Sequence, residues 1–155
     1  MQDITLEKLK LTDVDDFLEI VNDKQVLRFY RFAYARNIPQ ALKILKVFTD
    51  PKRCLSYKVL NKDNICVGIV TCELNKDTLG ISYIIGKKHR NQRYATSTLQ
   101  ELFKTLRNLN KFKQVFFIVD VKNTYSEKLL KNFNCNREDV KWNGTKYYLY
   151  DKCIP

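Results

Sequence analysis

The chain has 155 residues, of which 45% are hydrophobic and 29% charged, a mix typical of one globular domain, here residues 1–155. No apolar stretch approaches the length of a membrane-crossing helix, and the N-terminal residues do not resemble a signal peptide, so we expect a cytoplasmic protein without a membrane partner. The net charge of +11 favours an anionic partner, whether a nucleic acid, a membrane surface or a phosphorylated ligand, although a solvated basic surface without a specific partner would carry the same charge.

The first half of the chain predicts a strand and two helices, followed by three strands. Residues 4–11 alternate as in a strand, and Thr12 can cap the amphipathic helix that follows. A second helix is expected to begin near Pro39. Polar turns then separate three strand-like runs, which indicates an antiparallel meander. These runs cover residues 55–61, 65–75 and 78–86.

The second half predicts a helix, a strand, a second helix and a closing hairpin. Residues 95–109 have the spacing of an amphipathic helix. Residues 114–121 form a nearly continuous apolar run, which predicts a strand covered on both faces, and residues 124–133 predict another helix. Asn143 and Gly144 between two strand-like segments are a strong hairpin signal. The predicted order is β-α-α-β-β-β-α-β-α-β-β, in a mixed α/β sheet.

The five cysteines do not indicate a metal site. No Cys-x-x-Cys pair occurs, and His89 is the only histidine in the sequence, so we expect no metal. We interpret the thiols as reduced and buried, because free cysteine is among the most buried residue types.

A dense basic run precedes the helix at 95–109. Lys87, Lys88, Arg90 and Arg93 crowd a helix N-terminus, where the macrodipole disfavours cations. Free backbone N–H groups and the same dipole make a strand–loop–helix junction a natural anion site. The basic side chains become favourable once a phosphate group lies among them. The run therefore predicts a phosphate-binding loop.

Two segments of this half resemble the signatures of the GNAT acyltransferases. Residues 82–103, SYIIGKKHRNQRYATSTLQELF, resemble the cofactor motif, in which a strand leads into Arg/Gln-x-x-Gly-x-Gly/Ala and a helix. Residues 119–135, VDVKNTYSEKLLKNFNC, resemble the second signature, Asn-x-x-Ser/Ala followed by a helix. The resemblance implies a GNAT-like fold with a splayed, mostly antiparallel sheet. The branch that it resembles most closely acetylates ribosomal-protein N-termini.

The resemblance also implies acetyl-CoA as the acyl donor. Backbone amides of residues 91–96 would hold the pyrophosphate, and the strand end at 83–85 would pair with the pantetheine arm and polarise the thioester carbonyl. Asn123 would bond the arm or an ordered water. The cofactor-binding residues implied in this way are Tyr83, Ile84, Ile85, Arg90, Asn91, Gln92, Arg93, Tyr94, Ala95, Thr96 and Asn123.

Arg93 stands where the first motif has its central glycine. Glycine there would let the backbone approach phosphate closely and would adopt a positive φ without strain. Arginine leaves two alternatives. Its backbone keeps an ordinary conformation while the side chain clamps phosphate or extends into solvent, or it narrows the loop and weakens cofactor binding.

The residues for proton transfer are implied less directly. Leu130 stands where the family often has a tyrosine acid, and Ser126 falls on a serine that has this role in the resembling branch. Ser126 is therefore the candidate acid, with a small residue beside the cofactor as the alternative. The strand carboxylate of that branch would fall at Gly80, so Glu73 is the candidate base, with a solvent-facing glutamate as the alternative.

The acceptor region is expected at residues 28–37, RFYRFAYARN, where Tyr30 and Tyr34 are the candidate substrate-binding residues. Packing onto the sheet and RNA binding are the alternatives for this stretch. We expect an N-acetyltransferase, a monomer or homodimer, that acetylates the primary amine of a protein N-terminus or small molecule. Two other functions stay open: a catalytically impaired GNAT-like protein that binds a ligand or partner, and an RNA-associated acyltransferase.

Overall fold

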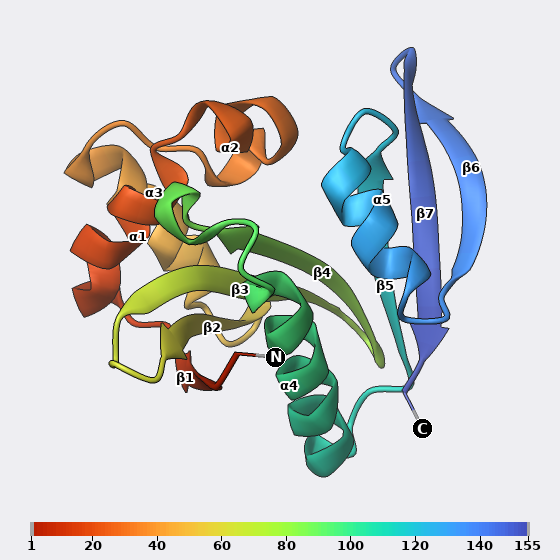
Figure 1. Cartoon of the computed structure of the whole chain (residues 1–155), viewed down its shortest axis with the longest axis horizontal. Helices are drawn as coiled ribbons and strands as arrows, with labels where there is room; N and C mark the ends of the chain where they lie inside the picture. The colour runs from red at the N-terminus through yellow and green to blue at the C-terminus, as the bar shows by residue number, and fades with distance from the viewer. Residues whose placement is uncertain (1, 155) are drawn as a thin grey trace.

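A seven-stranded sheet organises the chain, with helices on both of its faces (Figure 1). The computed structural model describes residues 2–154. The strands are β1 (Ile4–Lys8), β2 (Cys54–Asn61), β3 (Cys66–Asn75), β4 (Thr78–Ile85), β5 (Gln114–Asp120), β6 (Asn136–Trp142) and β7 (Thr145–Cys153). The helices are α1 (Val14–Val21), α2 (Lys24–Phe29), α3 (Ile38–Phe48), α4 (Tyr94–Leu109) and α5 (Thr124–Lys131), with short 3-10 turns at η1 (Leu11–Asp13), η2 (Arg31–Ala33) and η3 (Lys87–His89). Among the described residues, no helix is long and apolar enough to span a bilayer.

The predicted order of elements is confirmed except for one helix. Three α-helices, not two, lie between β1 and β2, because α2 was not predicted. Its six residues span less than two turns, too few for an apolar period to be read. A side-chain cap fixes this helix instead: Asp23 accepts a hydrogen bond from the backbone N–H of Gln25 at 3.1 Å. The first strand also ends earlier than predicted, at Lys8, and η1 follows it from Leu11.

The two faces of the sheet pack against different helices. α1 and α3 cover one face through a core that includes Phe17, Leu45 and, from β4, Ile84. α4 and α5 cover the opposite face through a core that includes Leu102 and, from β4, Tyr83. Successive strand residues point to opposite faces, so the neighbours Tyr83 and Ile84 belong to different cores. β4 is therefore held from both sides, which fixes the strand that borders the site described below.

The sheet opens between β4 and β5. β4 pairs with β3 along its whole length. It pairs with β5 over three residues only, where Thr78–Gly80 runs parallel to Gln114–Phe116. The strands then separate, and α5 lies beside the gap (Figure 1). All other neighbouring strands are antiparallel, which confirms the predicted splayed and mostly antiparallel sheet.

The C-terminal part of the sheet corrects one prediction and confirms another. β5 is not covered on both faces: its residues alternate between buried and less buried, and Ile118 is 60% exposed. α5 packs on one face only, which explains the alternation. The hairpin signal is confirmed, since β6 and β7 meet at Asn143 and Gly144, with φ values of 49° and 79°. Positive φ at both positions matches the twist of a two-residue hairpin turn.

Candidate active site

The basic run forms a tight junction between β4 and α4. The 3-10 turn η3 follows the strand, and two of the next residues have a left-handed backbone: Asn91 has φ of 62° and Arg93 has φ of 66°. Asparagine tolerates this conformation, whereas for arginine it costs roughly 1 kcal/mol. The first alternative for Arg93 is thus wrong in its premise, because the backbone does not keep an ordinary conformation. Arginine replaces the glycine of the motif, but the backbone at this position keeps the left-handed conformation that glycine adopts easily.

Like α1, and unlike α2, α3 and α5, α4 has no side-chain cap at its N-terminus. Side chains of Asp23, Asn37 and Asn123 cap α2, α3 and α5 by accepting backbone N–H groups. Arg93 makes no such bond at the start of α4, and the first turn of α4 contains no acidic residue. The first-turn N–H groups, which have no partner within a helix, are therefore available to an external acceptor. With Lys87 nearby, this end of the helix has the donors and the charge of an anion site.

Arg90 connects this loop to α2 across the end of β4. Its Nε donates to the Ile85 carbonyl at 3.1 Å, and its guanidinium forms an ion pair with Asp23, the N-cap of α2. The Asp23 side chain is 9% exposed and that of Arg90 is 25% exposed, so water screens this pair only partly. The loop and α2 are thus joined by one charged contact.

The free edge of β4 lines the gap. The Gly86 N–H donates to the Val67 carbonyl on β3 at 2.8 Å. Backbone groups alternate in direction along a strand, so those of Ile85 and Tyr83 point the other way, toward β5. The Arg90 bond to the Ile85 carbonyl agrees with this direction. Unpaired edge groups of this kind can add an extended ligand as if it were a further strand.

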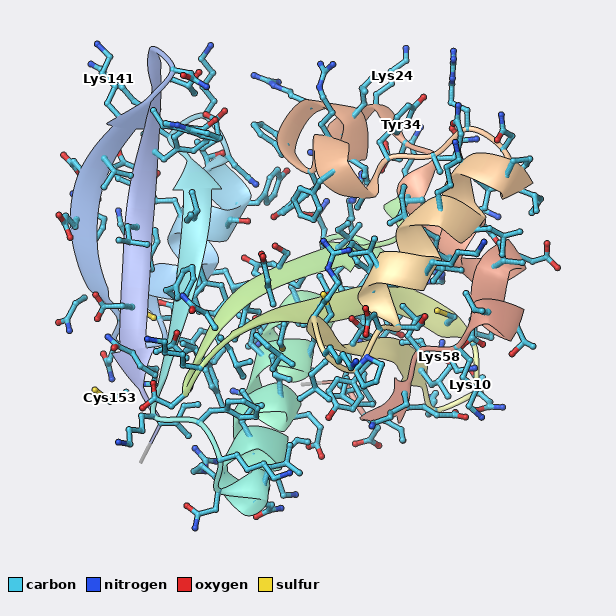
Figure 2. All side chains as sticks on the ribbon, turned by 180° about the vertical axis from the view of Figure 1, so that it is seen from behind. Lys10, Lys24, Tyr34, Lys58, Lys141 and Cys153 are labelled. Atoms are coloured by element: carbon cyan, nitrogen blue, oxygen red, sulfur yellow. The ribbon has the colours of Figure 1, made fainter. Side chains whose placement is uncertain are left out.

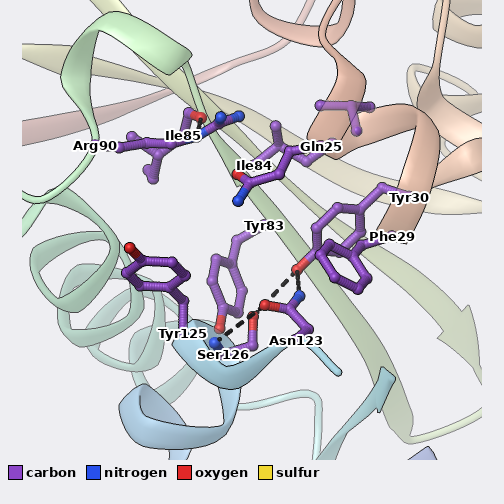
Figure 3. Close-up of a pocket in the computed structure, with 11 residues that line it drawn as sticks. Gln25, Phe29, Tyr30, Tyr83, Ile84, Ile85, Arg90, Asn123, Tyr125 and Ser126 are labelled. Atoms are coloured by element: carbon purple, nitrogen blue, oxygen red, sulfur yellow. Dashed lines mark hydrogen bonds between the residues drawn. The ribbon is translucent and has the colours of Figure 1, made fainter. Parts of the chain in front are cut away.

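A cavity of about 100 Å³ lies between this edge, α2 and the start of α5. Figure 3 shows side chains from all three converging on it. The lining residues are Gln25, Val26, Phe29, Tyr30, Tyr83, Ile84, Ile85, Arg90, Asn123, Tyr125 and Ser126. Apolar walls with a few convergent polar groups are typical of a small-molecule site.

Three hydroxyl groups and one amide meet at the inner end of the cavity (Figure 3). The Tyr30 hydroxyl lies 3.3 Å from the Ser126 hydroxyl. Asn123 Nδ2 donates weakly to the Tyr30 oxygen at 3.5 Å, while Asn123 Oδ1 accepts from the Ser126 N–H at 3.4 Å. Tyr83 points toward the same serine, but its buried hydroxyl has no hydrogen-bond partner among residues 2–154. We call Tyr30, Tyr83, Asn123 and Ser126 the hydroxyl cluster.

Both tyrosines of the hydroxyl cluster stay protonated at neutral pH. Burial raises the pKa of Tyr30, and hydrogen bonds from Ser126 and Asn123 oppose the rise only in part. Burial also raises the pKa of Tyr83 far above its ordinary value, and the nearby Tyr30 adds to the rise. The hydroxyl cluster is therefore a set of neutral donors, in which Tyr83 and Ser126 are buried and Tyr30 is half-buried.

The cavity brings together only part of the predicted site. Tyr30, Tyr83, Asn123 and Ser126 meet there, with Ile84, Ile85 and Arg90. Asn91, Gln92, Arg93, Tyr94, Ala95 and Thr96 form the loop and the first turn of α4. Tyr94 is buried within that turn, at 8% exposure, so only its backbone can take part.

Glu73 and Tyr34 do not line this cavity. Glu73 is exposed on β3, directly opposite Gly80 of β4. Tyr34 packs against the core under α1 and α3, and Figure 2 shows it beside α3. The structure gives neither residue a contact with the hydroxyl cluster, so their assignment as base and acceptor ligand rests on the sequence alone.

Four lining residues are not among the predicted site residues: Gln25, Val26, Phe29 and Tyr125, of which Phe29 lies in the predicted acceptor region at 28–37. Gln25 and Phe29 belong to α2, the helix whose short length hid its period. Tyr125, which is 65% exposed, stands at the mouth of the cavity. Its position inside the second signature was the available signal, but a signature does not show which way a side chain points.

Comparison with known proteins agrees with this architecture. Three solved structures that superpose on almost the whole chain are an acetyltransferase of the GNAT family from Bacillus anthracis (TM-score 0.83, 16% identity, covering 99% of this chain and 97% of the other), the spermidine N-acetyltransferase from Vibrio cholerae in complex with CoA and spermine (0.83, 12%, 97% and 95%), and the ribosomal L7/L12 alpha-N-protein acetyltransferase RimL in complex with CoA (0.84, 14%, 97% and 94%). At these identities the similarity establishes the fold. No curated protein matches the chain by sequence.

The family follows from the sequence match. The model of the acetyltransferase (GNAT) domain matches residues 3–136, most of the chain. This match confirms the resemblance drawn from the two signatures and the enzyme class expected from it. The chain belongs to the acetyltransferase (GNAT) domain family.

Proposed function

We propose that this protein transfers an acetyl group from acetyl-CoA to a primary amine. The observation that carries the proposal is the arrangement along β4, which has an anion site at one end of its free edge and the hydroxyl cluster beside the other part of that edge. A long ligand with a phosphate end and a neutral reactive end matches this arrangement. The two CoA complexes among the structures of similar fold support the same ligand class.

Each part of the site has a distinct role in this proposal. The first-turn amides of α4, with Lys87 and Arg93, would bind the pyrophosphate. The backbone of Tyr83 and Ile85 would pair with the pantetheine arm, which would exchange the Arg90 bond at the Ile85 carbonyl for one to the ligand. The buried Tyr83 hydroxyl supports a ligand at this position, since a buried polar group without a partner is costly.

The reaction itself is direct acyl transfer. The neutral amine nitrogen forms a bond to the acyl carbon, and the carbon–sulfur bond breaks with its electron pair on sulfur. The amine releases one proton, and the thiolate finally takes up one, so protons balance. Ser126, whose hydroxyl lies 3.3 Å from that of Tyr30, would donate a hydrogen bond to the sulfur. Glu73 stays a candidate base only if a water chain carries the proton to it, because it does not line the cavity.

The acceptor is a primary amine of a small molecule or a protein N-terminus. Structures of similar fold act on both kinds, spermidine in one and a ribosomal protein in another. Tyr125 and Phe29 at the cavity are the groups that would contact the acceptor near its amine. Exposed lysines do not favour one class: Lys24 on α2 and Lys141 near the hairpin turn both extend into solvent (Figure 2), and neither lines the cavity.

Isothermal titration with acetyl-CoA and with CoA tests the proposal first. Saturable binding of both is expected. Replacing Lys87 and Lys88 together by Gln should weaken binding by up to about tenfold, since each exposed charge contributes less than about 1 kcal/mol. The matched control replaces the exposed Lys52 and Lys76, which lie toward the other end of β4, and should bind as the wild type does.

Turnover then separates an enzyme from a binding protein. Release of free CoA thiol is followed with a panel of polyamines, amino acid amides and N-terminal peptides. Acetylation of at least one amine supports the proposal. Absence of saturable binding at millimolar acetyl-CoA contradicts it, and binding without turnover for any amine favours the catalytically impaired alternative.

A further inference from the structure

The hydroxyl cluster contains more hydroxyl protons than hydrogen bonds between its hydroxyl groups. Tyr30, Tyr83 and Ser126 each carry one hydroxyl proton, and a single hydroxyl–hydroxyl contact joins Tyr30 to Ser126. The Tyr83 hydroxyl makes none. Two of the three protons are therefore directed at something other than the residues of the hydroxyl cluster. Buried donors of this kind favour a ligand atom that accepts more than one hydrogen bond.

The amide of Asn123 sets the direction of the chain. Its Oδ1 accepts from the Ser126 N–H, so its Nδ2 is the end that faces Tyr30 and donates to the phenol oxygen. The Tyr30 proton is then best placed to donate to the Ser126 oxygen at 3.3 Å. This leaves the Ser126 proton free, next to that of Tyr83. Figure 3 shows both tyrosine hydroxyls directed at the serine.

We propose that Tyr30 is a positioning residue, which orients the Ser126 hydroxyl so that the Ser126 and Tyr83 protons converge on the leaving sulfur of the acyl donor. This inference rests on the proposed function and refines it. Tyr30 was expected to bind the acceptor, and here it acts on the donor side instead. Leu130 occupies the position of the family's usual tyrosine, and Tyr30, which directly follows α2, supplies a phenol from the opposite side of the cavity.

The hydroxyl cluster stabilises the thiolate by hydrogen bonds and does not hand over a proton. A thiol has an ordinary pKa of about 8.5, whereas burial raises the pKa of both Tyr30 and Tyr83 above that of free tyrosine. Proton transfer from phenol to thiolate would thus run uphill. Two hydrogen bonds to a developing negative charge in a partly buried cavity lower the barrier without such a transfer.

The test compares CoA with desulfo-CoA, which lacks the sulfur, between about pH 7 and about pH 9.5, across the ordinary pKa of a thiol. The ratio of the two dissociation constants isolates the sulfur, because effects of pH on the protein cancel. In the wild type, CoA should gain affinity over desulfo-CoA as the thiol ionises. In Tyr30→Phe, Ser126→Ala and Tyr83→Phe, the gain in affinity of CoA over desulfo-CoA at the upper pH should be about tenfold smaller. This factor corresponds to the loss of one charge-assisted hydrogen bond.

Several controls separate positioning from damage to the fold. Desulfo-CoA should bind all variants as it binds the wild type, which shows that each is folded. Tyr57→Phe, which removes a hydroxyl on β2 two strands away from β4, should keep the wild-type pH dependence. In turnover, Tyr30→Phe should lower kcat and leave the KM for acetyl-CoA unchanged.

Two results overturn the inference in different ways. If CoA and desulfo-CoA bind, and the three variants of the hydroxyl cluster keep the wild-type pH dependence, the hydroxyls do not address sulfur, while the proposed function stands. If neither ligand binds the wild type, the proposed function fails and the inference fails with it.

Discussion

Two strand–helix junctions border the gap in the sheet, and they are built in opposite ways. At the β4–α4 junction the loop is basic and exposed, the backbone bends to φ of 66° at Arg93, and no side chain caps the helix. At the β5–α5 junction Asn123 caps the helix, and Asn123 and Ser126 are both buried. Both helices begin at the same end of the sheet, so topology alone does not explain the difference.

The two junctions have different roles: the β4–α4 junction binds negative charge, and the β5–α5 junction supports the chemistry. An uncapped helix end with cations around it attracts a phosphate group. It would be poorly suited to stabilise a leaving thiolate through selective hydrogen-bond donors. At the capped helix end, Asn123 accepts the Ser126 N–H, and what this end offers the ligand is neutral hydroxyls, those of Tyr30 and Tyr83 with raised pKa values. The same local motif thus serves as an anchor on one side of the gap and as a donor array on the other.

The largest expected effect is at the capped junction. Ser126→Ala should lower kcat on the order of a hundredfold, as loss of one donor to a developing negative charge does elsewhere. The KM for acetyl-CoA should change little, because the anchor at α4 is intact. Steady-state kinetics measures both. A rise in KM with unchanged kcat would instead assign Ser126 to ground-state binding.

The next largest effect is expected at the ion pair between the β4–α4 loop and α2. Arg90→Gln leaves Asp23 largely buried without its cation, and should lower the free energy of unfolding by about 2 kcal/mol. Urea denaturation measures this loss. The double variant with Asp23→Asn should recover part of it, since no uncompensated charge then remains. A single variant as stable as the wild type would show that solvent reaches the pair.

Tyr83 should show the opposite sign. Tyr83→Phe removes a buried hydroxyl without a partner, and should raise the free energy of unfolding by about 1 kcal/mol while lowering activity. The folded state holds this phenol proton more tightly than the unfolded state does. The wild type therefore loses no stability from this group below about pH 10, and its free energy of unfolding falls as pH rises above that value, where the unfolded phenol ionises. Above pH 10, the free energy of unfolding of Tyr83→Phe should therefore fall less steeply with pH than that of the wild type. Equal stability and equal pH dependence would mean that the hydroxyl is already satisfied.

The smallest effect is expected at the uncapped junction. Arg93→Gly relieves a left-handed arginine but adds backbone freedom to the unfolded chain, so a net gain of about 0.5 kcal/mol in stability is expected. Binding of acetyl-CoA should weaken severalfold if the side chain contacts phosphate. Asn91→Gly is the matched control, with a similar φ and no charge removed. Tighter binding in Arg93→Gly would show that arginine obstructs the loop.

The two junctions also differ in how well the sequence predicted them. Motif spacing located the loop at Arg90 and the site residue Asn123, because both depend on residues close in the chain, but it did not predict that Asn123 caps α5. The partnership of Tyr30 with Ser126 joins positions 96 apart in sequence, and no local pattern predicts it. The bend at Arg93 was not predicted, because the glycine that would signal it is replaced by arginine while the backbone keeps a positive φ.

The fold was predictable where periods were long. Helices of 11 and 16 residues and the strands of the meander were identified from their spacing. α2, with six residues, was not. The open face of β5 was missed because its apolar residues continue onto the exposed side at Ile118, and a continuous apolar run does not distinguish one covered face from two.

A crystal structure with acetyl-CoA bound tests the central claim most directly. The claim predicts the pyrophosphate at the backbone amides of residues 91–96, the arm along the free edge of β4, and the sulfur within hydrogen-bonding distance of Ser126 Oγ. A cofactor bound elsewhere, or a thioester placed away from Tyr30 and Ser126, would contradict it.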